Sequence, residues 1–132
     1  MEARDVVDYA LQRRARLTEL ASGRVPRVEV CDADPYLQSA ARHYGALTSH
    51  HCPVCSKARL THVHYVYGDA LGRIAGQAKS IAELRGMDAA FEAFRVYLVE
   101  VCAACGWNQL VRSFVLGRER HEFDSVAEGF GV

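Results

Sequence analysis

Two cysteine pairs of identical spacing constrain this chain more than any other feature of its sequence. The first pair is CPVC at residues 52–55 and the second is CAAC at residues 102–105. A C-x-x-C turn brings two thiolates to one ion, and Zn²⁺ takes four such ligands at about 2.3 Å in a tetrahedron. Together the pairs complete one shell. The sequence therefore predicts a single structural Zn²⁺ bound by Cys52, Cys55, Cys102 and Cys105.

The segment between the pairs is longer than the roughly 15 to 20 residues of compact four-cysteine sites. Residues 61–67, 95–101 and 107–116 are rich in β-branched and aromatic side chains and predict three strands. Between the first two strands, residues 68–94 contain a glycine-rich loop and then a helix that begins at a Ser80/Glu83 capping box. This pattern predicts a three-stranded antiparallel zinc ribbon with a loop-helix insertion.

The N-terminal part predicts a pair of helices. Apolar residues recur at helical spacing over residues 3–22, and Gly23 is placed to end that helix in a left-handed turn. Asp34 and Pro35 are a typical N-cap and first residue for a second helix over residues 35–44. Residues 24–33 predict an extended connector or a short strand. A DNA-binding helix-turn-helix is disfavoured because this connector is too long.

The predicted fold class is therefore α+β. A helical region over residues 1–48 precedes a zinc ribbon over residues 49–117, whose insertion is 68–94, and a tail follows over residues 118–132. The 132 residues are 50% apolar and 24% charged, which is ordinary for a folded protein. No signal peptide or membrane-spanning stretch is predicted, so we expect a cytoplasmic protein whose thiols stay reduced.

Other interpretations of the cysteines and histidines stay open at this stage. Iron accepts similar tetrahedral sulfur ligands. A redox dithiol is disfavoured because a redox C-x-x-C normally opens a helix and occurs once. Cys31 is interpreted as a small buried apolar residue rather than a fifth ligand. Four histidines admit a second metal site, but we favour solvated or strand-packed roles for them; they are His50, His51, His62 and His64.

The order of cysteine turns, strands and insertion over residues 51–117, with CPVC and CAACGW, resembles zinc ribbons such as those of transcription elongation factors and RNA polymerase subunits. The whole chain also resembles an uncharacterised family of small proteins from GC-rich bacteria, a domain of unknown function. That likeness lies in CDADP at residues 31–35, HVHYVYG at 62–68 and CGWN at 105–108. It implies no activity.

We predict a non-catalytic protein, because four cysteines leave zinc no open position and no nucleophile–base–acid arrangement is evident. Sixteen basic residues balance sixteen acidic ones, so any contact with nucleic acid must be local. Arg73, Lys79 and Arg85 predict a basic patch on the insertion, and Trp107 and Arg112 add aromatic and basic groups on the ribbon. The first hypothesis is docking to a nucleic-acid machine such as RNA polymerase or the ribosome.

Two alternatives are a protein–protein adaptor without nucleic-acid contact and a thiol oxidoreductase. Zero net charge and the apolar N-terminal helices favour the adaptor over a general nucleic-acid binder. The oxidoreductase requires metal-free protein with a reactive cysteine of low pKa. Neither a membrane nor a small-molecule substrate is predicted as a partner.

Overall fold

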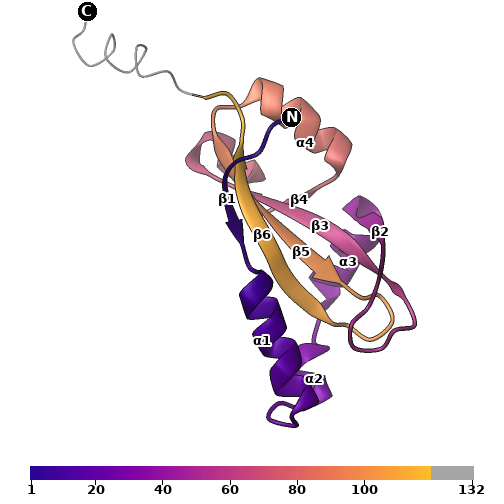
Figure 1. The fold of residues 1–132 in the computed structure, drawn as a ribbon. Coiled ribbons are helices and arrows are strands. Elements are labelled where there is room, and N and C mark those ends of the chain that lie inside the picture. The colour runs from indigo at the N-terminus through magenta and orange to yellow at the C-terminus, as the bar shows by residue number, and fades with distance from the viewer. Residues whose placement is uncertain (120–132) are drawn as a thin grey trace, which may run out of the picture.

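A computed structural model describes residues 1–119 and shows one antiparallel sheet with helices on both of its faces (Figure 1). Along the chain the elements are β1 (Arg4–Asp8), α1 (Ala10–Ala21), α2 (Arg27–Val30), α3 (Pro35–Tyr44), β2 (Ala46–His51), β3 (Arg59–Tyr67), the 3₁₀ helix η1 (Asp69–Ile74), β4 (Ala78–Lys79), α4 (Ile81–Ala90), β5 (Phe94–Val101) and β6 (Asn108–Leu116).

The strands are ordered β1-β6-β5-β3-β2. The short β4 pairs with β3 along the same edge as β2, further along the strand. The predicted α+β class is confirmed, and the three predicted strands correspond to β3, β5 and β6. The prediction of a three-stranded ribbon is wrong, because the sheet has six strands. The other three strands pair with the predicted ones: β1 with β6, and β2 and β4 with β3. Neither β1 nor β2 has the alternating apolar pattern by which the sequence marks a half-buried strand.

The predicted N-terminal helical pair is also wrong, since three helices precede β2. Helix α1 begins only at Ala10, where the Asp8 carboxylate accepts the Ala10 N–H at 2.8 Å. The expected extended connector contains the short helix α2. Helix α3 has the predicted bounds, and its Asp34 cap is confirmed because Oδ1 accepts the Leu37 N–H at 2.8 Å.

The insertion contains η1, β4 and α4. The predicted capping box is present: the Glu83 N–H donates to Ser80 Oγ at 3.1 Å, and the Ser80 N–H donates to Glu83 Oε1 at 2.9 Å. Helix α4 ends at Ala90, earlier than predicted, because Phe94 already begins β5. Most of the predicted C-terminal tail, residues 120–132, lies outside the described residues.

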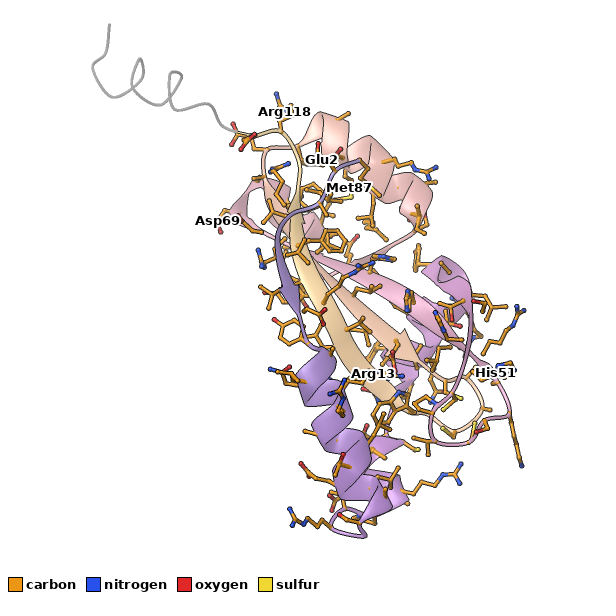
Figure 2. The ribbon with its side chains drawn as sticks, in the orientation of Figure 1. Glu2, Arg13, His51, Asp69, Met87 and Arg118 are labelled. Carbon is orange, nitrogen blue, oxygen red and sulfur yellow. The ribbon has the colours of Figure 1, made fainter. Side chains whose placement is uncertain are left out.

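Alternate positions along β3 and β5 face different layers. Val66 and Val96 face α4 and pack with its Leu84 and Met87. On the opposite face, α3 covers Val63 and other apolar side chains near it. Figure 2 shows Met87 pointing from α4 toward the sheet. A third apolar cluster surrounds the cysteines at the other end of the sheet, next to α1 and α2 (Figure 1).

No helix within residues 1–119 is long and apolar enough to cross a membrane.

Candidate metal centre

The four predicted ligand cysteines meet at one end of the sheet. Cys52 and Cys55 lie in the turn between β2 and β3, and Cys102 and Cys105 lie in the turn between β5 and β6. Because β3 and β5 are neighbours, the two turns face each other. All four Sγ atoms lie within 4.8 Å of one another, and among residues 1–119 no other group of three or more candidate ligands is this close.

The sulfur spacing fits a tetrahedral ion. Cys52 Sγ lies 3.7 Å from Cys105 Sγ, and Cys55 Sγ lies 3.6 Å from Cys102 Sγ. Four sulfurs at about 2.3 Å from a central zinc would be separated by about 3.8 Å along each edge. The cluster therefore has the donor type, number and spacing of a closed structural site.

Backbone N–H groups surround the sulfurs as they do in thiolate metal sites. Those of Val54 and Lys57 donate to Cys52 and Cys55, at 3.4 and 3.5 Å. In the second turn, the N–H of Cys105 donates to Cys102 Sγ and that of Trp107 donates to Cys105 Sγ, both at 3.4 Å. Such donors stabilise the thiolate form and orient each ligand.

Both turns require a left-handed residue directly after their second cysteine. Gly106 has φ +89° in the second turn, where glycine takes this conformation without strain. Ser56 has φ +58° at the matching position of the first turn. Its N–H bonds to the Cys52 carbonyl at 3.0 Å, as that of Gly106 bonds to the Cys102 carbonyl at 2.9 Å. The two turns share one geometry despite different sequences.

The thiols themselves indicate why a cation is needed here. Burial raises the pKa of Cys52 and that of Cys105, whereas the Lys57 N–H is the main cause that lowers the pKa of Cys55 to about 6. Four thiolates this close also repel one another. A divalent cation at their centre offsets both the burial and the repulsion, so metal binding and thiol deprotonation are coupled.

A group of three hydrogen-bonded side chains lies next to the second turn. Trp107 is fully buried (0% exposed), and its Nε1–H donates to Glu100 Oε2 at 2.7 Å. Arg13 of α1 bonds to the same oxygen at 2.9 Å, and Figure 2 shows where Arg13 lies between α1 and the strands. Neither Glu100 nor Arg13 was predicted from the sequence as part of the site. A single acid inside the apolar run of residues 96–105 was the available signal.

The segment after α2 docks on the second turn. The Ala33 N–H donates to the Gly106 carbonyl at 3.0 Å, and Asn108 Nδ2 donates to Asp32 Oδ1 at 2.9 Å. Cys31, expected to be a buried apolar residue, is half-buried and its Sγ lies 3.5 Å from Cys105 Sγ. The centre is therefore built from three segments rather than two.

The residues predicted to bind a partner are dispersed over the structure. Arg73 is in η1 and Arg85 in α4, both exposed; Lys79 pairs with Glu83 at 3.7 Å. Arg112 lies on β6 opposite Asp8 of β1. Trp107 is inside the metal-end cluster and presents no surface to a partner.

Three of the four histidines line a hollow of about 410 Å³ beside Asp8 and Glu100; these are His50, His51 and His62. Their nitrogens do not converge as the cysteine sulfurs do. His64 is packed within the sheet, and burial is the main cause that lowers its pKa to about 4. The strand-packed interpretation holds for His64.

Fold and site define a class: a small α+β protein whose sheet carries a four-cysteine cluster at one end that can hold a metal ion. The chain belongs to DUF5318, a family of unknown function, whose match covers residues 1–129. It is 46% identical over 114 residues to the uncharacterized proteins Mb0050 of Mycobacterium bovis and Rv0049 of Mycobacterium tuberculosis, covering 86% of this chain and 83% of each relative. No solved structure matches the chain.

Proposed function

We propose that this protein is a non-catalytic, zinc-stapled binding protein that holds single-stranded nucleic acid on an exposed part of its sheet, as a component of a transcription or translation assembly. Zinc is proposed because four thiolates in a tetrahedron suit it best among common cellular metals. A closed shell leaves no position for a substrate at the metal. The site's role is then to hold the turns at one end of the sheet.

The observation that carries this proposal is a group of partly exposed tyrosines on the same sheet face as α3; one of them, Tyr65, also packs against the α3 cluster. Tyr65 pairs across the strands with Tyr97, and Tyr67 lies two positions further along β3. Together with Val99 they line a hollow of about 440 Å³, and Tyr67 is 46% exposed. We call Tyr65, Tyr67 and Tyr97 the tyrosine face.

Two arginines lie at one side of the tyrosine face. Arg95 pairs with Tyr67 across β3 and β5. On its other side Arg95 pairs with Val115 of β6, which pairs in turn with Arg4 of β1, so Arg4 lies in the same row across the sheet. Arg95 bonds to the Asp5 carbonyl and Arg4 to the Gly117 carbonyl, at 2.9 and 3.0 Å. Neither guanidinium has a carboxylate partner within residues 1–119.

Aromatic side chains on an exposed part of a sheet, beside arginines without a carboxylate partner, suit the binding of unpaired bases. Bases stack on aromatic rings with about 1 to 3 kcal/mol each, largely without regard to sequence. Arginine supplies contacts to the phosphates. The face fits this role better than the predicted basic patch does, because Lys79 is already paired and Arg73 and Arg85 lie on separate elements.

Fluorescence anisotropy with a labelled single-stranded oligonucleotide tests the proposal. Tyr67→Ala should weaken binding about tenfold, as loss of one stacked base implies, and Arg95→Gln should lower the salt dependence by about one phosphate contact. Tyr36→Ala is the matched control, since Tyr36 is 86% exposed on α3 and outside the hollow. No binding by the wild type, salt-independent binding, or equal effects of Tyr67→Ala and Tyr36→Ala would each count against it.

The protein–protein adaptor remains a second candidate because apolar side chains of the N-terminal helices face solvent. Leu11 of α1, Val28 of α2 and Tyr36 of α3 are all strongly exposed. A tagged pull-down with and without nuclease separates the two functions. A partner retained after nuclease, and lost in Leu11→Ser with Val28→Ser, supports the adaptor.

A further inference from the structure

A fifth cysteine contacts the metal centre from outside. Cys31 ends α2, and its Sγ lies 3.5 Å from Cys105 Sγ. This distance is similar to the 3.6 and 3.7 Å that separate ligand sulfurs across the two turns. Cys31 is nevertheless not one of the four cysteines whose sulfurs all lie mutually close. Its sulfur touches one ligand without sharing the central position.

The backbone fixes this contact. The Ala33 N–H bonds to the Gly106 carbonyl, and a Cβ added at Gly106 would lie 3.0 Å from the Cys31 carbonyl oxygen. The chain around Cys31 is thus held as close to the second turn as a glycine allows. Two sulfurs in van der Waals contact on segments held in this way are placed to form a bond after a small rotation of each side chain.

The sulfur pair is also accessible. A hollow of about 360 Å³ opens beside it and is lined by Arg27, Lys57, Cys31 and Cys105 among others. Cys31 and Cys105 are both half-buried. A molecule the size of hydrogen peroxide can enter this hollow, and of the three cysteines that line it, Cys31, Cys55 and Cys105, only Cys31 lies outside the proposed metal shell.

We propose that Cys31 is a peroxide-reactive residue that withdraws Cys105 from the metal by forming a Cys31–Cys105 disulfide. The proposal rests on a zinc-loaded centre but not on nucleic-acid binding.

The proposed oxidation of Cys31 and Cys105 has two steps. The Cys31 sulfur attacks one peroxide oxygen, the O–O bond breaks, and hydroxide leaves to give a sulfenic acid after the thiol proton makes water. The Cys105 thiolate then attacks the Cys31 sulfur, the S–S bond forms, and the S–O bond breaks with release of hydroxide. The two sulfurs lose two electrons and the peroxide gains two. Zinc is left with three thiolates.

This reaction would link the oxidation state of the protein to the integrity of the sheet end that zinc holds. An external dithiol returns both cysteines to thiols, after which zinc can bind again. Cys31→Ser is the informative variant, because serine is similar in size and retains a hydrogen-bonding group but cannot form the bridge.

The experiment treats the zinc-loaded full chain with hydrogen peroxide and follows zinc release with a chromogenic chelator, then maps disulfides by mass spectrometry. We expect one zinc released per Cys31–Cys105 bridge in the wild type, and release at least about tenfold slower in Cys31→Ser. Should Cys31→Ser fold poorly, wild-type protein alkylated at Cys31 in its zinc-bound form replaces it, with the same protection expected.

Two results would overturn the proposal. One is zinc release from Cys31→Ser or from the alkylated protein at the wild-type rate. The other is a bridge found within Cys52–Cys55 or Cys102–Cys105 instead. Because no nucleic acid is present, failure here is distinguishable from failure of the proposed function, which is read by anisotropy on reduced protein.

Discussion

The two ends of the sheet are held by different means. At one end, α4 covers an apolar cluster with few charges, built from Val66, Leu71, Leu84, Met87, Phe94, Val96, Phe114 and Leu116. At the other end, the cluster has five cysteines and one tryptophan, and of its five leucines and valines only Val30 and Leu60 are buried. A chain of 132 residues has limited apolar surface to bury. Where burial is insufficient to close a pair of turns, a metal ion bound by the four cysteines would supply the missing free energy.

The Trp107–Glu100–Arg13 group belongs to the metal end, and it shows that this end must also provide partners for a buried carboxylate. A carboxylate that is 4% exposed requires partners, and it receives them from the tryptophan ring and from α1. The α4 end needs no such group because its buried side chains are apolar. The metal end therefore depends on a few particular side chains, and substitution should disrupt it more easily than the α4 end.

Metal removal should give the largest effect and should act on one end first. Structural zinc contributes about 10 to 16 kcal/mol of apparent binding energy in small domains, so chelation should unfold the metal end. Trp107 is the only tryptophan of the chain and is buried beside the cysteines, so its emission should shift to longer wavelength. Cys52→Ser should reproduce the shift. A Cys52→Ser protein that is folded and zinc-replete would contradict the assignment.

Truncation at the α4 end should destabilise the protein without changing its metal content. Leu84 is 1% exposed, so Leu84→Ala should cost about 3 kcal/mol in urea unfolding. Ile81 lies on the same helix but is 37% exposed, and Ile81→Ala is the control, with a cost of less than about 1 kcal/mol. Loss of zinc from Leu84→Ala under native conditions would show that the two ends are not independent.

Stability should depend on pH through His64, a buried histidine of β3 between the two ends of the sheet. Burial lowers the pKa of His64 to about 4 in the folded protein, against about 6.5 in the unfolded chain. The unfolded state therefore binds more protons as pH falls from about 6.5 toward 4, and stability falls over that window. Between pH 7 and 5.5 the loss from His64 should be about 1 kcal/mol.

Urea titrations at the two pH values measure this loss, and His64→Gln is the comparison. The variant should be less sensitive to pH by about the same 1 kcal/mol. Zinc content is assayed at both values, so that metal loss is not mistaken for titration of His64. An unchanged pH dependence in His64→Gln would contradict the prediction.

The smallest effect should distinguish the two cysteine turns. Ser56 has a left-handed φ at the position where the second turn has Gly106. Ser56→Gly should therefore stabilise the protein by about 0.5 to 1 kcal/mol. Gly106→Ala should destabilise it, because the added Cβ would lie 3.0 Å from the Cys31 carbonyl. Thermal unfolding of zinc-loaded proteins measures both, and a destabilised Ser56→Gly would mean that the Ser56 side chain has a role of its own.

The candidate site could be predicted largely from the sequence, whereas the sheet could not. Cysteines at C-x-x-C spacing identify themselves because ligand chemistry depends on residue type and on a short turn. The cap at Asp34 and the capping box at Ser80 were also predictable, since each bond joins residues three apart. Arg13 and Cys31 could not be predicted as parts of the centre, because their partners are 87 and 74 residues away.

By itself the sequence determined the four clustered cysteines, the three central strands and the two capped helices, since local spacing and side-chain chemistry suffice for these. Tertiary structure alone decided that Arg4–Asp8 becomes a strand rather than the start of a helix, because pairing with β6 outweighs a weak local preference. It also decided which part of the α3 side of the sheet stays exposed. The tyrosine face and the contact of Cys31 with Cys105 follow from packing between distant segments, which no local pattern encodes.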